Sequence, residues 1–327
     1  MGRALWGLLR VIALLAIIAA TFVYLGPVER VERGEVARVD LDDPAGWLAA
    51  REARFDDITE GAEAQILWAG EAGAASDVVV LYLHGFSATS QEIRPVPDRV
   101  AEALGANLIL ARLPGHGRDG AAMAEPRAGD WLDETEAMLR LARGIGERVV
   151  VMGTSTGGTL ASWAASDPEM AEDVAAMVLI SPNYALANPA GVLVEWPLAR
   201  VWAPWVAGAE RSFEPINDGH GRYWTTAYPT EATVTLGTLL REIRARDFSD
   251  VTVPALFMFA DTDRVISASA VREFSAQWGG DATLMPVAVP EEGGDPFHHV
   301  IAGDILSPAL TERVVRDVTD WLREVLY

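Results

Sequence analysis

One short stretch carries the residues whose types and spacing could form a covalent catalytic centre. Gly153-Thr154-Ser155-Thr156-Gly157 directly follows Val149–Met152, an apolar, mostly β-branched run typical of a strand buried on both faces. Thr159–Ala165 then has a helical pattern. A Gly-x-Ser-x-Gly between strand and helix puts the serine on a sharp turn, with its hydroxyl above the sheet and the positive end of a helix beside it. This arrangement suits a nucleophile whose product carries an oxyanion.

Other polar residues follow other predicted strands. We predict buried strands at Asp77–Leu83, Asn107–Leu110, Val174–Ile180, Val253–Phe259 and Thr283–Val289. Their alternation with helices indicates a parallel sheet covered on both faces, and ligands of such sheets bind beyond the carboxyl ends of the strands. A serine, then an aspartate, then a histidine, each after a different strand, is the order expected of the catalytic triads of this fold class. The polar residues at the strand ends are His84 to Ser87, Arg112 to Gly117, Ser155, Ser181, Asp261, Asp263, His298 and His299.

The remaining segments complete an α/β pattern. Ile58–Trp68 predicts one or two antiparallel lead-in strands. The alternation breaks between Asn183 and about Asp250, a stretch rich in proline and tryptophan. Helices are predicted over Gln91–Leu104 with Gly105 as its stop, from Asp130 as its cap to about Arg143, over Ala268–Trp278, and over Thr311–Val325.

Five motifs in this order resemble the α/β-hydrolase superfamily, in particular its carboxylesterase and monoacylglycerol-lipase-like branch (the serine aminopeptidase S33 type). The motifs are His84-Gly85-Phe86, Leu113-Pro114-Gly115-His116-Gly117, the serine pentapeptide, Asp263 after a strand, and His299-Val300-Ile301. The resemblance covers roughly residues 55–326. It implies an α/β-hydrolase fold: a mostly parallel, doubly wound sheet with a helical cap insertion at about 183–250.

The resemblance also implies roles for individual residues. Ser155 would be the nucleophile, and the backbone N–H groups of Phe86 and Thr156 would form the oxyanion hole. The acid would be Asp263, with Asp261 as the alternative, although Phe259-Ala260 departs from the more common His-Gly pair of these families. The base would be His299, with His298 as the alternative. His84 and His116 belong to the two loop motifs. A metal site at His298, His299 and Asp295 is disfavoured because adjacent histidines point apart.

The cap insertion is where substrate selection is expected. Ala185–Gly208 is mostly apolar, and an insertion after this strand would lie over Ser155. Trp196, Trp202 and Trp205 are candidates for an apolar wall around an acyl chain, which could also touch the membrane. The alternative is a small helical subdomain whose tryptophans form its own core.

The N-terminus has the pattern of a membrane helix. Ala4–Leu25 contains one charge, Arg10, and as a helix would span roughly 33 Å. Arg3 and Arg10 predict a cytoplasmic N-terminus with the catalytic body exported. A cleaved signal peptide is the alternative, disfavoured by the long apolar run. The predicted organisation is an anchor at 1–27, a linker at 28–54, and a hydrolase domain at 55–327.

Composition excludes several classes of function. The net charge is −21, and a body this acidic would repel nucleic acid. All 26 basic residues are arginine, which excludes Schiff-base and phosphate-loop chemistry that needs lysine. The chain has no cysteine, which excludes thiol nucleophiles, thiolate metal sites and disulfides. We expect no cofactor and no metal.

The combined prediction is a membrane-anchored serine hydrolase that cleaves carboxylic esters, of short to medium acyl chain or monoacylglycerol type, through an acyl-enzyme on Ser155. Acyl transfer or peptide cleavage by the same triad remains open, as does a catalytically silent binding module of the same fold. A dinucleotide-binding oxidoreductase fits poorly, because the Gly-x-Gly-x-x-Gly spacing is missing.

Overall fold

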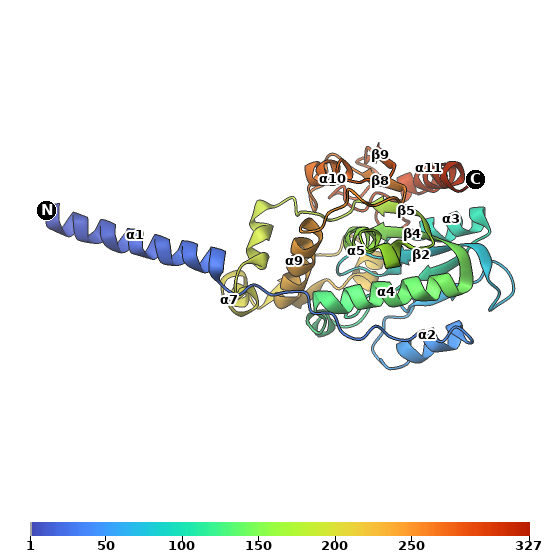
Figure 1. Cartoon of the computed structure of the whole chain (residues 1–327), viewed down its shortest axis with the longest axis horizontal. Coiled ribbons are helices and arrows are strands. Elements are labelled where there is room, and N and C mark those ends of the chain that lie inside the picture. Colours follow the sequence, from blue (N-terminus) through green and yellow to red (C-terminus); the bar gives the residue numbers. More distant parts are fainter. Residues whose placement is uncertain (1) are drawn as a thin grey trace.

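A seven-stranded sheet forms the centre of the molecule (Figure 1). The computed structural model describes residues 2–327, and their side chains except at residues 2–4 and 19. The strand order is β1-β3-β2-β4-β5-β8-β9, in which only β1 runs antiparallel to its neighbour. The strands are β1 (Gln65–Leu67), β2 (Ser76–Leu83), β3 (Asn107–Leu110), β4 (Gly146–Thr154), β5 (Val174–Ile180), β8 (Ala255–Phe259) and β9 (Ala282–Pro286).

Helices cover both faces of this sheet, as the sequence pattern predicts. Alternate residues of β2 enter two separate cores: Val79, Leu81 and Leu83 point to one face, and Val78, Val80 and Tyr82 to the other. The first face is covered by α4 (Ala128–Ile145), α5 (Thr156–Ala165), α6 (Pro168–Ala171), α9 (Glu231–Arg244) and α10 (Ala268–Ser275), and the second by α3 (Val96–Leu104) and α11 (Pro308–Leu326).

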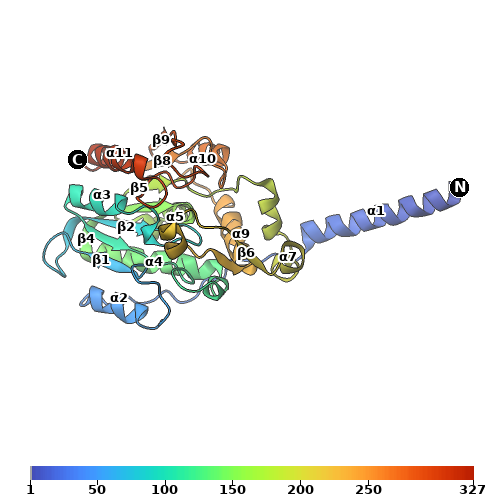
Figure 2. The ribbon, with the colours of Figure 1, turned by 180° about the vertical axis from the view of Figure 1, so that it is seen from behind.

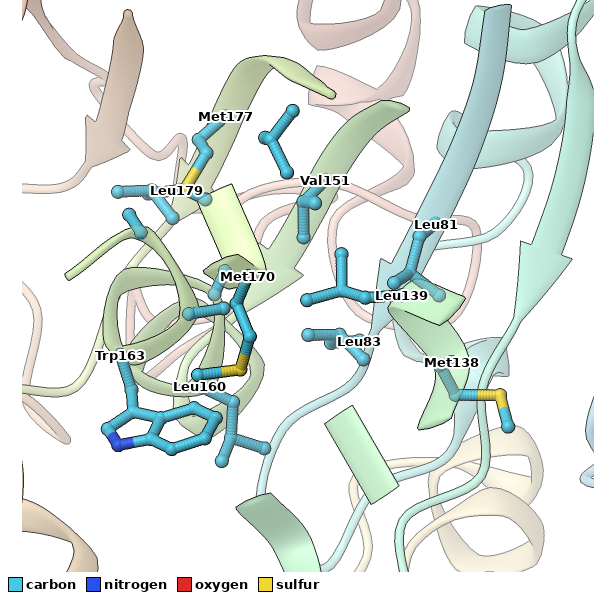
Figure 3. Close-up of a cluster of buried hydrophobic side chains, with 14 of the residues drawn as sticks. Leu81, Leu83, Met138, Leu139, Val151, Leu160, Trp163, Met170, Met177 and Leu179 are labelled. Carbon is cyan, nitrogen blue, oxygen red and sulfur yellow. The ribbon is translucent and has the colours of Figure 1, made fainter. Parts of the chain in front are cut away.

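Figure 3 shows part of the first core. Leu81, Leu83 and Val151 of the sheet face side chains of α4, α5 and α6, among them Leu139, Leu160, Trp163 and Met170. Fully burying one such side chain stabilises the fold by about 1.5–3 kcal/mol. This packing fixes α5, and therefore the turn that precedes it, against the ends of β2 and β4.

Two local predictions were wrong. The helix predicted over Gln91–Leu104 is broken into a 3₁₀ turn, η1 (Ser90–Glu92), and α3, because Pro95 has no N–H and disfavours helical geometry before it. Asp130 is not the cap of α4 but its third residue, where it accepts the Arg127 backbone N–H at 2.7 Å. The prediction of one or two antiparallel lead-in strands in Ile58–Trp68 is confirmed, because β1 lies in this range and runs antiparallel to β3.

The segment predicted as a linker is packed against the body. Arg33 pairs with Asp133 and Glu136 of α4, and α2 (Pro44–Glu52) is a helix inside the predicted linker. Residues 26–43 are called the strap below.

The cap contains more than helices. It comprises η3 (Pro189–Glu195), α7 (Ala199–Ala207), β6 (Glu210–Ser212), α8 (Asp218–Tyr223), β7 (Ala227–Pro229), and α9, and β6 pairs antiparallel with β7. A further 3₁₀ turn, η2 (Ala121–Ala124), lies in the body.

The N-terminal helix α1 (Gly2–Leu25) projects away from the rest of the chain (Figure 2). Its residues Leu5–Leu25 have a mean hydropathy of 2.5, and none of this stretch is buried in the protein. By length and composition this helix is able to cross a bilayer, a property that it shares with signal sequences.

Candidate active site

Ser155 is the single residue between the end of β4 at Thr154 and the start of α5 at Thr156. Its backbone has φ 52° and ψ −115°, a conformation that costs a non-glycine residue about 1–3 kcal/mol. Two bonds hold it: the Ser155 N–H donates to the Ile180 carbonyl at 2.9 Å, and the Asn183 N–H donates to the Ser155 carbonyl at 3.1 Å. The strained turn is therefore fixed by the end of β5 and the start of the cap.

The glycines on either side of Ser155 allow a very close approach of backbone segments. A Cβ atom on Gly157 would lie 1.9 Å from the Leu83 carbonyl oxygen of β2, and one on Gly153 would lie 2.5 Å from the Gly157 backbone. Neither position has space for a side chain. The spacing of the pentapeptide thus reflects contact between the first turn of α5 and the strand ends.

Asp263 and His299 form the hydrogen-bonded pair expected of an acid and a base. His299 Nδ1 lies 2.8 Å from Asp263 Oδ2, and the Asp263 side chain is fully buried. The other carboxylate oxygen, Oδ1, accepts the backbone N–H groups of Val265 at 2.7 Å and Ile266 at 2.9 Å. Both oxygens are therefore committed, and the carboxylate is fixed in its orientation toward the imidazole.

The alternative residues have other partners. Asp261 is exposed and pairs with Arg272 at 2.7 Å. His298 has a positive φ of 56°, and its Nδ1 lies 2.6 Å from Thr262 Oγ1. The structure therefore pairs the two preferred residues with each other and neither of the alternatives with them.

The charge around His299 favours its protonated form. Burial lowers the pKa of His299. The charge and hydrogen bond of Asp263, together with the charges of Asp295 and Glu92, outweigh burial, so that the pKa lies above its ordinary value. With Nδ1 directed at the carboxylate, Nε2 is the nitrogen left to exchange a proton with a nucleophile.

Two side chains that the motifs did not identify hold the His299 loop. Ser181 Oγ, at the end of β5, donates to the His299 carbonyl at 2.7 Å. Asp295 Oδ2 accepts the backbone N–H groups of His299 and Val300, both at 2.9 Å. Within residues 2–327, side chains apart from the masked ones form no cluster of three His, Cys, Asp or Glu able to hold a metal ion. Asp295 is instead occupied by backbone donors.

The loop after β2 lies directly against Ser155. A Cβ on Gly85 would lie 3.2 Å from the Ser155 Cβ, so the peptide of Gly85 and Phe86 borders the nucleophile turn. Thr156 is the first residue of α5, where backbone N–H groups have no partner within the helix. The Phe86 ring packs edge-on against Tyr228 of the cap, with ring centroids 5.3 Å apart. The backbone and the ring of Phe86 thus have separate roles.

The histidines of the two loop motifs are structural. His84 Nε2 accepts the Leu113 N–H at 3.0 Å, which joins the loop after β2 to the loop after β3. Burial holds the pKa of His84 well below its ordinary value and lowers that of His116 to about 4. Both imidazoles are therefore neutral at physiological pH.

Glu92 is a buried carboxyl group behind the same loop, and the sequence analysis missed it. Its Oε1 accepts the Gly85 N–H and the Tyr82 hydroxyl, both at 2.6 Å, and the Tyr82 hydroxyl also lies 3.0 Å from Thr154 Oγ1. Burial raises the pKa of Glu92 to about 7 despite these hydrogen bonds and the nearby His299. Its only sequence signal is a position shortly after the His84-Gly85-Phe86 motif.

No described hydrogen bond or ring contact joins the three cap tryptophans to Ser155. Trp205 is 89% exposed, and Trp202 donates its Nε1–H to the Pro197 carbonyl at 2.9 Å. Helix α9 packs against both α5 and α7, and it lies between them in Figures 1 and 2. Trp196 precedes α7 and is 37% exposed. The acyl wall at these tryptophans therefore stays a prediction.

Comparisons with known proteins agree with this geometry. The profile of the alpha/beta hydrolase family matches residues 80–304. A thermostable monoacylglycerol lipase from Bacillus sp. (strain H-257) is 29% identical over 196 residues, which cover 58% of this chain and 72% of that protein.

Solved structures share the fold. One belongs to a study of two metagenome-derived lipolytic enzymes; it has a TM-score of 0.64 and 21% identity, covering 82% of this chain and 99% of the other. A monoacylglycerol lipase from Paleococcus ferrophilus has a TM-score of 0.59 and 15% identity, covering 80% and 98%. The chain therefore belongs to the alpha/beta hydrolase family, as a hydrolase similar to its lipase- and esterase-type members.

Proposed function

We propose that this protein is a serine hydrolase that cleaves carboxylic esters through an acyl-enzyme. The observation that carries the proposal is the strained turn of Ser155 at the same sheet edge as the hydrogen-bonded Asp263–His299 pair. A backbone held at φ 52° by surrounding hydrogen bonds, together with an imidazole fixed by a carboxylate, matches the needs of an activated nucleophile.

The proposed reaction has two halves. As the Ser155 Oγ–carbon bond forms, His299 Nε2 takes the hydroxyl proton, and Asp263 stabilises the resulting imidazolium. The imidazolium then gives that proton to the leaving alkoxide, and the C–O bond of the ester breaks. In the second half a water molecule loses a proton to His299, adds to the acyl carbon, and releases the acid as Ser155 recovers its proton.

The negative oxygen formed in each half would be held by two backbone donors. The N–H groups of Phe86 and Thr156 are proposed for this role because their loops border Ser155. Each such donor contributes about 3 kcal/mol to the transition state. Both are fixed before substrate binds, one by the hydrogen bond of Gly85 to Glu92 and the other by the packing of α5.

For the substrate we propose acyl esters of short to medium chain or monoacylglycerols. The named lipases among the comparisons favour a lipid ester. We further propose that residues 1–27, which include α1, are a single-pass anchor with a cytoplasmic N-terminus. Residues 28–54 would connect it to an exported hydrolase domain at 55–327, with its cap at about 183–250.

Covalent labelling with a fluorophosphonate tests this proposal. Wild type should be labelled, and Ser155→Ala should not. The matched control is Ser166→Ala, at the other end of α5, where Ser166 Oγ donates to the Trp163 carbonyl and accepts a hydrogen bond from Arg246 Nη1 at 3.0 Å. This variant should label like wild type. Equal labelling of Ser155→Ala would show that another residue is the nucleophile.

The same preparation separates the alternatives. A folded wild type that takes up no label would point to a silent binding module. A labelled enzyme that leaves p-nitrophenyl and glycerol esters intact but acts on aminoacyl amides, or transfers the acyl group to an added alcohol, would replace ester hydrolysis by peptide cleavage or acyl transfer.

A further inference from the structure

The helix α7 presents an apolar face that no part of the described chain covers. Leu198, Val201 and Trp205 recur at a spacing of three and four residues and are 47%, 64% and 89% exposed. On the opposite side of the helix, Ala199 and Ala203 are buried. This much exposed apolar surface on a nine-residue helix, in a chain of net charge −21, indicates a site of interaction with a partner.

This face begins where the N-terminal helix ends. The Leu198 N–H donates to the Pro27 carbonyl at 3.1 Å, two residues beyond the end of α1. A Cβ on Gly26 would lie 2.7 Å from the Pro197 Cβ, so the two segments are in direct contact. Figures 1 and 2 both place α7 against the end of α1, at the end of the body nearest that helix.

Charged contacts hold α7 in this position. The Glu29 carboxylate accepts two hydrogen bonds from Arg200, one from Nε at 2.7 Å and one from Nη2 at 2.6 Å. Arg200 also donates to Thr235 Oγ1 of α9 at 2.9 Å. The single charged side chain of α7 is thereby turned toward the strap and α9. The exposed face carries no charge that would oppose its entry into an apolar medium.

We propose that the α7 face lies in the interface of the same membrane that α1 enters, so that the cap is docked on the lipid surface. Tryptophan is favoured at this depth because its ring is amphipathic. An amphipathic helix parallel to the membrane buries its apolar face a few ångströms into the boundary between headgroups and acyl chains. This proposal rests on the proposed role of α1 as a membrane anchor. In it, the exposed α7 side chains contact the lipid surface instead of lining a pocket for the acyl chain of the substrate.

Spin labelling of the full chain tests the docking, and the absence of cysteine makes single-site labelling possible. Nitroxides would be attached at Val201→Cys and Trp205→Cys, with Ala13→Cys in α1 as the membrane reference. The aqueous control is Glu324→Cys on α11, at the opposite end of the molecule. Each variant is reconstituted in vesicles of phosphatidylcholine and phosphatidylglycerol, and its fold is checked by thermal unfolding.

The readout is collision of each label with a water-soluble nickel chelate and with oxygen. Labels at 201 and 205 should collide with the chelate roughly tenfold less than the label at 324 and should gain oxygen collisions, as the label at 13 does. Chelate collisions at 201 and 205 equal to those at 324, with the label at 13 protected, would overturn the docking and leave the anchor standing.

Two other results would also decide the matter. Exposure of all four labels to the chelate would remove the anchor and the docking together. Spin–spin broadening at 201 and 205 that grows with the ratio of protein to lipid would assign the α7 face to a second copy of the chain. Because no arm measures hydrolysis, each result is independent of the ester hydrolase assignment.

Discussion

Side chains have opposite environments at the sheet edge around Ser155, formed by the carboxyl ends of the parallel strands, and on the α7 face of the cap. At the sheet edge, polar groups are buried and paired: both oxygens of Asp263 are bonded, and Glu92, only 2% exposed, holds Gly85 and Tyr82. On α7, apolar groups are exposed, with Trp205 at 89%. The buried carboxylates of the first region have their partners within the described chain, whereas we propose that the second region meets a lipid surface outside it. The residues proposed for catalysis and the surface proposed for membrane contact therefore lie in different parts of the fold.

This difference has a physical origin. Moving a proton at a defined atom requires fixed partners and a low dielectric, and the Asp263 and Glu92 carboxylates are accordingly held by hydrogen bonds from neighbouring loops and strands. Contact with a fluid bilayer needs apolar area without fixed partners. The two regions therefore respond to substitution differently, and the predictions below use that contrast.

The largest effect is expected at the acid. Asp263→Asn should lower kcat/KM by about 10⁴-fold, because the amide no longer orients or stabilises the imidazolium. The remaining activity should depend on pH differently: the pKa of His299, which Asp263 raises, should fall and move the acid limb of the profile to lower pH. The control is Asp261→Asn, whose exposed partner is Arg272. Equal losses in both variants would refute the assignment of the acid. Steady-state hydrolysis of a soluble ester measures both.

Backbone packing beneath Ser155 should show the next largest effect. Gly157→Ala would place a Cβ 1.9 Å from the Leu83 carbonyl, and we expect a loss of about 3 kcal/mol or more in the free energy of unfolding. In the cap, Gly221→Ala on α8 meets only an ordinary contact, at 3.4 Å from Pro215, and should be neutral or slightly stabilising. Urea unfolding of the two variants compares them. A tolerated Gly157→Ala would mean that α5 can shift away from β2.

Glu92 links stability at the sheet edge to pH. Its pKa is about 7 in the folded protein against 4.5 in the unfolded chain, so the folded state binds the proton more tightly. Below pH 4.5 the protonated Glu92 contributes about 3 kcal/mol to the free energy of unfolding, and this contribution is lost as the pH rises to 7. Glu92→Gln keeps an acceptor for Gly85 and removes this dependence.

The measurement for Glu92 is the difference in unfolding free energy between wild type and variant, taken between pH 4.5 and 7.5. Wild type should lose stability relative to Glu92→Gln across this range. Because the charge of Glu92 also raises the pKa of His299, the variant's activity should begin at lower pH. A constant difference across the range, with an unshifted activity profile, would contradict this account of Glu92.

The motifs predicted the sheet edge well because they record close contacts. Gly157 is a glycine since a Cβ would collide with Leu83, and Val174–Ile180 was predicted with its observed limits because an apolar run between polar ends is buried on both sides. Glu92 and Asp295 were not identified as site residues, since single acidic residues in loops are indistinguishable in sequence from those on a surface. Their roles depend on which loops meet in space.

The cap resisted prediction for a different reason. Its tryptophans signalled apolar surface, but composition does not tell whether that surface faces a pocket, a core or a membrane. The position of α9 between α5 and α7 decides this, and it depends on the path of the whole insertion. The strap was likewise predicted as a plain linker, although Arg33 and Glu29 tie it to the body.

The smallest effect is expected where the strap meets the cap. Glu29→Ala should change the unfolding free energy by less than about 1 kcal/mol, because the pair with Arg200 is partly exposed and Arg200 keeps its bonds to Thr235 and to the Glu231 carbonyl. Residues 26–43 should nevertheless be cleaved faster by added protease, since the strap loses its fixation beside α7. Glu32→Ala, an exposed change in the same strap, is the control. Unchanged cleavage in Glu29→Ala would mean that the Pro27–Leu198 hydrogen bond and the Gly26–Pro197 contact suffice to hold α1 against the cap.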